Sequence, residues 1–150
     1  MVDGQCMKLF CHNKTWDEAD AHCKAKGGRL GRILNNIRND WILNSVYPKS
    51  VWFGGSRKVD NNWMDSAGYP LIYTNWAPTQ PDHWWKPGWE CILANGINRW
   101  GSQMAATYWG DHPCDERFCH ICEDNAEGKI LSKIEGRLKS KLEIETRNRK

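Results

Sequence analysis

The chain has 150 residues and a net charge of +3, a size that fits one domain with room for an appendage. Residues 125–150 carry eight Lys or Arg and four Glu, a balance of +4, so residues 1–124 come to −1. A nearly neutral body argues against a general nucleic-acid binder, which would be basic on its folded face. No stretch approaches the ~20 apolar residues of a membrane span, so we expect none.

The cysteines all precede the basic tail. They are Cys6, Cys11, Cys23, Cys91, Cys114, Cys119 and Cys122. Seven cysteines in a chain of this length are typical of an oxidised, extracellular domain. The alternative is a zinc cluster, since Cys119 and Cys122 form C-x-x-C near His112 and His120, but no second C-x-x-C accompanies it. The odd count leaves one thiol that is free or paired with another chain.

Two helices are predicted in the first third of the chain. Thr15 followed by Glu18 is a capping box that opens the first helix, and Gly27-Gly28 ends it. One face of this helix would carry Trp16, Ala19 and Cys23. A second helix is predicted over residues 36–47, with Pro48 beyond its end.

Short strands are predicted after Pro48, over residues 51–53, 71–73, 91–93 and 117–122. Residues 76–90 show little helix or strand pattern. Besides Trp76, this stretch contains three of the chain's ten tryptophans. Two helices followed by short strands indicate an α+β fold. A long loop without secondary structure in a compact domain is usually functional.

The tail has a different composition from the body. Its apolar residues fall at spacings of three and four along a charged segment, at Leu131, Ile134, Leu138 and Leu142. We therefore divide the chain into a domain over residues 1–124 and a basic tail over residues 125–150 that is helical or disordered. An oligomerising helix is the sharper interpretation, but the stripe is shorter than a coiled coil requires and Gly128 and Gly136 weaken it.

Several short motifs occur in a fixed order between Cys6 and Glu123. They are Trp16, Glu18, Ala19 and Cys23; Gly27-Gly28-Arg29-Leu30; Trp52-Phe53-Gly54-Gly55; Trp63-Met64-Asp65; Tyr73-Thr74-Asn75-Trp76; Trp109-Gly110-Asp111; and Ile121-Cys122-Glu123. With the cysteine spacing, this series resembles the C-type lectin-like domain. The resemblance implies two helices, short antiparallel strands and a long ligand-binding loop, stabilised by disulfides. No set of catalytic roles assembles, so we expect no enzyme.

The resemblance implies two disulfides that the family shares, Cys23–Cys122 and Cys91–Cys114. Cys11 and Cys119 are extra to that pattern. Because the terminal strands are neighbours in this fold, we predict a third bond, Cys11–Cys119, which leaves Cys6 as the odd thiol. The alternative is a Cys6–Cys11 bond with Cys119 free.

The tripeptide Gln80-Pro81-Asp82 resembles the family motif in which a central cis proline presents two oxygen ligands to one Ca²⁺. The amide-then-acid order implies galactose or N-acetylgalactosamine-type sugars, with Trp84 against the apolar face of the sugar. The implied calcium ligands, which are also sugar contacts, are Gln80, Asp82, Glu90 and Asp111. Such carboxylate and amide oxygens are the ligands that Ca²⁺ prefers.

The sequence departs from the family pattern at two ligand positions. Trp89 stands where the family has a Glu, with Glu90 one place late, and Gly110 stands where it has an Asn. The alternative function is therefore a calcium-independent protein-interaction module that uses Trp85 and Trp89. Ice or mineral binding, known for relatives of the fold, is a third alternative that nothing in the sequence selects.

The expected partners and location follow from the same features. We expect a secreted protein that binds galactose-type glycans weakly at each site, with a protein ligand as the alternative partner. Oligomerisation through the tail or through Cys6 would then supply avidity.

Overall fold

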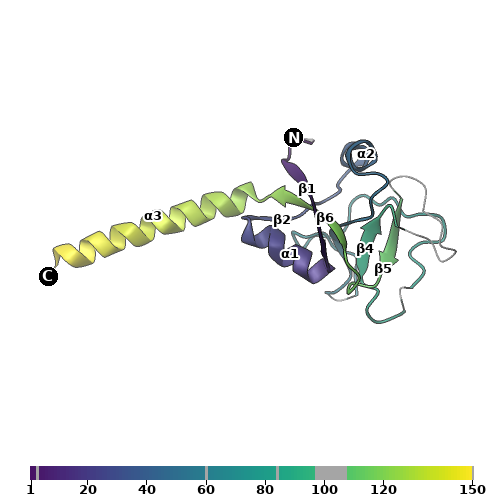
Figure 1. Ribbon diagram of the computed structural model, residues 1–150. Coiled ribbons are helices and arrows are strands. Elements are labelled where there is room, and N and C mark those ends of the chain that lie inside the picture. Colours follow the sequence, from purple (N-terminus) through teal and green to yellow (C-terminus); the bar gives the residue numbers. More distant parts are fainter. Residues whose placement is uncertain (3, 60, 84, 97–107, 150) are drawn as a thin grey trace.

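The computed structural model describes residues 1–2, 4–59, 61–83, 85–96 and 108–149. In chain order the elements are β1 (Met7–Lys14), α1 (Trp16–Ala25), β2 (Gly28–Leu30), α2 (Asn36–Ser45), β3 (Val51–Ser56), β4 (Cys91–Ala94), β5 (Trp109–His112), β6 (Phe118–Asp124) and α3 (Ala126–Asn148). Figure 1 shows a compact body formed by the strands, α1 and α2, and a single long helix, α3, that leaves the body after β6. The predicted α+β fold is confirmed.

Strand β6 connects the two ends of the domain. The sheet has the order β1-β6-β3-β4-β5, and β2 also pairs with β6. β6 runs antiparallel to β1 and β2 and parallel to β3. Met7 of β1 faces Glu123 of β6, so the beginning and the end of the domain are adjacent strands.

Glu123 adds a buried ion pair to this junction. Its side chain is inaccessible to solvent, and one carboxylate oxygen accepts a hydrogen bond from Arg32 Nε at 3.1 Å while the other lies 3.7 Å from Arg38 Nη1. The backbone N–H of Arg32 also donates to this carboxylate. A buried carboxylate is tolerated when it is paired and hydrogen-bonded in this way.

Both predicted helices are present, and the capping box predicted for the first one is confirmed. The Thr15 hydroxyl accepts from Glu18 N at 3.2 Å, and Thr15 N donates to the Glu18 carboxylate at 3.4 Å, which completes the capping box. Asn35 caps α2 by accepting from Arg38 N at 3.0 Å. α2 ends at Ser45, two residues before the predicted end at residue 47, because the N–H groups of residues 46 and 47 both donate to the Ile42 carbonyl.

The strand predicted over residues 71–73 is wrong. The segment contributes one backbone hydrogen bond, from Leu71 N to Trp63 O at 3.2 Å, and the isolated bridge next to it joins Met64 to Pro70. Leu71 and Tyr73 instead pack against the core from an irregular segment. The apolar character that suggested a strand therefore reflects burial rather than sheet pairing.

The sheet separates two clusters of buried side chains. Along β3, Trp52 faces the cluster beneath α1, while Val51 and Phe53 face the cluster beneath α2 and the long loop. This alternation is the two-residue period of a strand buried on both faces. Trp109 of β5 is fully buried in the second cluster and donates to the Asn39 side chain at 3.0 Å, which ties β5 to α2.

Three disulfides close the fold. They are Cys11–Cys119, Cys23–Cys122 and Cys91–Cys114, and Cys6 is a free, exposed thiol. The predicted pairings are confirmed, and the alternative Cys6–Cys11 bond is wrong. Cys11–Cys119 joins β1 to β6, and Cys23–Cys122 joins α1 to the same strand, so two of the bonds reinforce β6.

The tail forms the helix α3, which was one of its two predicted states. Ile134, Leu138 and Leu142 are 46%, 56% and 63% exposed, so the apolar stripe is open to solvent. Within the described residues, none of the helices combines the length and the apolar character needed to cross a bilayer. Association through this stripe or through Cys6 stays a prediction.

Replacement of Cys11 and Cys119 together by serine removes a bond that spans 108 residues. A crosslink over so long a loop restricts the unfolded chain, so we expect the free energy of unfolding to fall by about 3–5 kcal/mol in urea denaturation. Cys6→Ser is the matched control, because it removes an exposed thiol without a bond. A double variant as stable as the parent would contradict the assignment of a stabilising role to this bond.

Candidate functional site

Asp111 of β5 anchors the start of the predicted binding loop. Its side chain is buried, and its two carboxylate oxygens accept hydrogen bonds from the backbone of the loop, from Asp82 N at 3.2 Å and from His83 N at 2.8 Å. The Gln80–Pro81 peptide bond immediately before them is cis, as the resemblance implied. β5 thus positions a buried carboxylate directly beneath the Gln80-Pro81-Asp82 turn.

Asp82, His83 and Asp111 form a group of side chains with metal-ligating atoms. These atoms all lie within 4.8 Å of one another. His83 Nδ1 is 2.5 Å from Asp82 Oδ1 and 4.0 Å from Asp111 Oδ1. Two of the predicted calcium ligands are therefore brought together, and His83, which was not among the predicted ligands, stands beside them.

The electrostatics of this group favour a bound cation. Burial raises the pKa of Asp111 above its ordinary value, and the neighbouring Asp82 carboxylate raises it further, while the two backbone hydrogen bonds act in the opposite direction. Without a counter-charge, the ionised form of Asp111 is thus held at a cost in free energy. A cation between the two carboxylates would relieve this cost.

Trp89 occupies the side of the site where the family pattern has a glutamate. Its ring is stacked on the His83 imidazole, with centroids 3.8 Å apart and planes inclined by 23°. Lys86 Nζ lies 5.2 Å from the Trp89 ring centroid. Trp85, in contrast, is 64% exposed. Trp84, the predicted sugar-stacking residue, lies outside the described residues.

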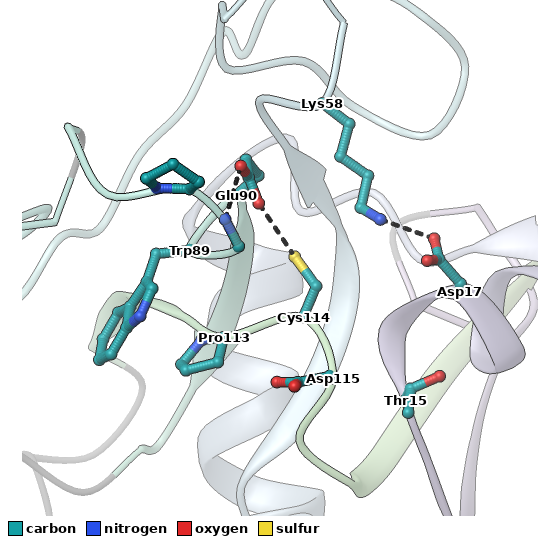
Figure 2. A pocket seen from close by; sticks show the side chains of 10 residues that line it. Thr15, Asp17, Lys58, Trp89, Glu90, Pro113, Cys114 and Asp115 are labelled. Atoms are coloured by element: carbon teal, nitrogen blue, oxygen red, sulfur yellow. Dashed lines mark hydrogen bonds and ion pairs between the residues drawn. The ribbon is translucent and has the colours of Figure 1, made fainter.

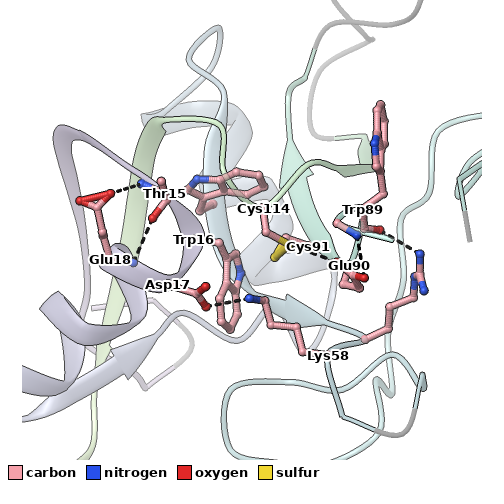
Figure 3. Close-up of a disulfide and its surroundings, with 12 residues drawn as sticks. Thr15, Trp16, Asp17, Glu18, Lys58, Trp89, Glu90, Cys91 and Cys114 are labelled. Atoms are coloured by element: carbon pink, nitrogen blue, oxygen red, sulfur yellow. Dashed lines mark hydrogen bonds and ion pairs between the residues drawn. A yellow bond between two sulfur atoms is a disulfide. The ribbon is translucent and has the colours of Figure 1, made fainter. Parts of the chain in front are cut away.

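Glu90 is not brought to the other predicted ligands. Its carboxylate accepts from Gly88 N at 2.8 Å, and its second oxygen lies 3.9 Å from Cys114 Sγ. Figure 2 shows this carboxylate directed toward the Cys114 sulfur, and Figure 3 shows it beside the Cys91–Cys114 disulfide, with the Trp89 ring pointing away from it. Gln80, the remaining predicted ligand, is half-buried next to the cis bond.

The Glu90 carboxylate faces a separate cavity of about 440 Å³. The cavity is lined by Thr15, Asp17, Lys58, Pro87, Gly88, Trp89, Glu90, Pro113, Cys114 and Asp115. Lys58 and Asp17 in its wall form an ion pair at 2.7 Å (Figure 2). Because the glutamate stands at position 90 and not at position 89, its carboxylate points away from Asp82, His83 and Asp111 and toward the opposite side of the loop.

Arg57 holds the loop in this conformation, and the sequence analysis did not identify it. It is 6% exposed, and its Nη2 atom donates to three loop carbonyls, those of His83 at 3.0 Å, Lys86 at 3.3 Å and Trp89 at 3.2 Å. Its backbone N–H donates to Glu90 O at 2.8 Å. The sequence feature that could have pointed to Arg57 is its position directly after the buried strand β3. Arg57 is a positioning residue for the segment that carries His83 and Trp89.

Comparisons with known proteins identify the family of the chain. The family model described as the lectin C-type domain matches residues 12–124. The versican core protein of Rattus norvegicus is 32% identical over an alignment of 127 residues, and the match covers 80% of this chain. The chain spans only 4% of the length of that versican.

Two solved structures are similar along most of the chain. The mouse scavenger receptor C-type lectin carbohydrate-recognition domain has a TM-score of 0.70 at 26% identity, over 83% of this chain and 92% of that one. A calcium-independent type II antifreeze protein has a TM-score of 0.70 at 29% identity, over 83% of this chain and 88% of that one. Together with the matched family model, these likenesses show that the chain belongs to the C-type lectin domain family.

Proposed function

We propose that this domain binds galactose or N-acetylgalactosamine-type glycans through a Ca²⁺ ion held by the Gln80-Pro81-Asp82 turn. The observation that carries the proposal is the convergence of the Asp82 and Asp111 carboxylates beside the cis Gln80–Pro81 bond. As a member of a family of binding modules, the chain is not an enzyme.

The ion would take its protein oxygens from Gln80, Asp82 and Asp111. Ca²⁺ needs six to eight oxygen ligands, so water, backbone carbonyls and two sugar hydroxyls would complete the shell. Glu90 would join only if residues 88–90 turned, because its carboxylate is hydrogen-bonded to Gly88 N at 2.8 Å. With so few protein ligands, we expect calcium affinity in the range of about 10⁻⁴–10⁻³ M that is typical of extracellular sites.

An aromatic ring beside the ion would supply selectivity. We propose that Trp84 stacks on the apolar face of the sugar, which is the role that the resemblance implies. Trp85 is 64% exposed near the same site and could extend the platform. Rings of this kind combine a large apolar face with a polar edge, which suits a sugar with one apolar face and several hydroxyls.

We further propose a secreted protein whose glycan binding depends on several copies. Three disulfides support an oxidising compartment. One sugar offers little area and its hydroxyl bonds mostly replace bonds to water, so a single site should bind weakly. Association through the exposed stripe of α3 or through Cys6 would raise the effective affinity.

The second candidate is a calcium-independent protein-interaction surface centred on the Trp-rich loop. The observation that favours it is the stack of Trp89 on His83, which places an aromatic ring where a carboxylate ligand would stand. The similarity to an antifreeze protein that is itself calcium-independent supports a metal-free use of this fold. Trp85 and Trp89 would then carry the contact.

Asp82→Ala tests the first proposal. Because this change removes one of two converging carboxylates without touching the core, we expect retention on a galactose column to disappear while the fold is preserved. Circular dichroism would check the fold. Asp115→Ala is the matched control, because Asp115 is exposed and lies on the wall of the other cavity.

Two outcomes distinguish the candidates. Retention of the parent that is lost in chelator and in Asp82→Ala, but kept in Asp115→Ala, supports calcium-assisted sugar binding. Ligand binding that is insensitive to chelator and to Asp82→Ala, but lost in Trp85→Ala, would contradict it and favour the protein-interaction surface.

The raised pKa of Asp111 predicts a pH limit for calcium. Without Ca²⁺, a carboxyl whose pKa is higher in the folded than in the unfolded protein stabilises the fold below the unfolded pKa, where it is protonated. This contribution to the free energy of unfolding is lost as pH rises through the folded pKa. Ca²⁺ binds the ionised form, so the added stability from Ca²⁺ should vanish as pH falls through the raised pKa of Asp111, above the ordinary Asp value of about 3.9.

Urea denaturation with and without Ca²⁺ across a pH series measures this limit, because titrating groups that do not contact the ion cancel in the difference. We expect a gain in the free energy of unfolding at neutral pH that is lost at a pH above the ordinary Asp value. A gain that persists down to about pH 3.9 would contradict the raised pKa or the role of Asp111 as a ligand.

A further inference from the structure

A group of three histidines lies on β1, α1 and β6, outside the long-loop site. His22 Nδ1 of α1 is 2.7 Å from His120 Nε2 of β6. His12 of β1 lies beside them, with its ring centroid 5.9 Å from that of His22. Two elements, α1 and β6, therefore bring imidazole nitrogens into contact, and β1 holds His12 nearby. The proposed sugar site uses none of the three.

The chemical identity of the group is set by the disulfide beside it. His22, Cys23, His120 and Cys122 have ligand-type atoms within 4.8 Å of one another. The two sulfurs are joined in the Cys23–Cys122 bond, so they are not thiolates and cannot serve as strong ligands. The remaining ligand set is imidazole nitrogen, which suits Zn²⁺, Cu²⁺ or Ni²⁺ and not Ca²⁺.

We propose that His22 and His120, with His12 as a third ligand, form a binding site for a divalent transition-metal ion of the Zn²⁺ type. The site is independent of the long loop and of its carboxylates. It would join β1, α1 and β6 next to the Cys23–Cys122 disulfide.

The His22–His120 distance requires little movement, whereas the exposed His12, which is not among the atoms within 4.8 Å of one another, has to turn toward them. With Zn–N bonds of 2.0–2.1 Å in a tetrahedral shell, two ligating nitrogens stand about 3.3–3.4 Å apart. The His22 and His120 nitrogens at 2.7 Å would therefore have to separate by roughly 0.6 Å. The two rings are nearly perpendicular, at 87°, and His22 is only partly buried, so a small rotation of its side chain provides this room.

His120 is the fixed member of the site. Its side chain is fully buried, and its ring is stacked on Phe10 with centroids 5.5 Å apart. Burial, followed by the neighbouring His22, lowers the pKa of His120 to about 4, so the ring is neutral near pH 7. A neutral imidazole offers one lone pair to a metal.

The proton positions are compatible with a cation between the rings. One hydrogen lies between His22 Nδ1 and His120 Nε2 when no metal is bound, because two neutral rings at this distance share a donor and an acceptor. When a cation enters, the proton of His22 can sit on its other nitrogen and that of His120 on Nδ1. His120 Nδ1 has no hydrogen-bond partner within the described part of the chain, so no existing bond fixes the other tautomer.

The surrounding charge limits the affinity. Burial first, and then Lys26 and Lys14, lower the pKa of His22, which keeps its ring neutral. The same lysines repel a dication, so we expect a site weaker than a structural zinc centre. A ligand anion from solvent could complete the shell and offset part of this repulsion.

Calorimetric titration of the metal-stripped, disulfide-intact full chain with ZnCl₂, in excess Ca²⁺ to occupy oxygen ligands, tests the proposal. We expect one Zn²⁺ per chain and a loss of about tenfold or more in affinity for His22→Ala, because even the loss of an outer-shell partner of a metal ligand costs about 10–100-fold in affinity. His12→Ala should weaken binding less. Asp82→Ala is the control that should bind Zn²⁺ as the parent does.

His120 is left unchanged because its fully buried side chain packs in the core. Imidazole nitrogen resonances provide the second readout, and Zn²⁺ should shift those of His22 and His120 in the parent protein. The proposal is overturned if Zn²⁺ produces no heat, if His22→Ala binds like the parent, or if Asp82→Ala abolishes binding, which would assign the ion to the long loop.

Discussion

The pairing of β6 with three other strands is the constraint on which the domain depends. β1, β2 and β3 are all hydrogen-bonded to this one strand, and two disulfides reach it from β1 and α1. The buried Glu123 at its end is paired with Arg32 and Arg38. Because both ends of the domain are fixed here, the middle of the chain can leave the sheet after β3 and return at β4 as a long loop without unfolding the rest (Figure 1).

The loop is shaped by two buried charged residues that act from opposite sides. Asp111 receives the N–H groups of Asp82 and His83, and Arg57 donates to the carbonyls of His83, Lys86 and Trp89. These bonds satisfy backbone groups that a loop cannot pair internally. They fix the backbone beside Asp82 and Trp89, while the Glu90 side chain turns to the other side of the loop and accepts from Gly88 N. Arg57 therefore shapes the candidate site without being one of its proposed ligands.

Local chemistry made much of the fold predictable. The capping box at Thr15 and the spacing of Trp16, Ala19 and Cys23 act within one helix, so the sequence alone reveals them. The apolar residues 71–73 did not reveal their state, because an irregular segment can bury the same side chains as a strand. The cis Gln80–Pro81 bond and the approach of Asp82 to Asp111 were implied by the family resemblance.

The role of Arg57 and the approach of His83 to Asp111 depend on long-range contacts. The turn of Glu90 toward Gly88 N is a short-range contact, but it follows from a loop conformation that no residue pattern encodes. The central claim, that the two converging carboxylates hold an ion that in turn holds a sugar, is tested most directly by calorimetric titration of the metal-stripped domain with Ca²⁺, repeated with galactose present. The account predicts heat that saturates with Ca²⁺ and galactose binding only when Ca²⁺ is there. Galactose heat that is unchanged in chelator, or no Ca²⁺ heat at millimolar concentrations, would contradict it.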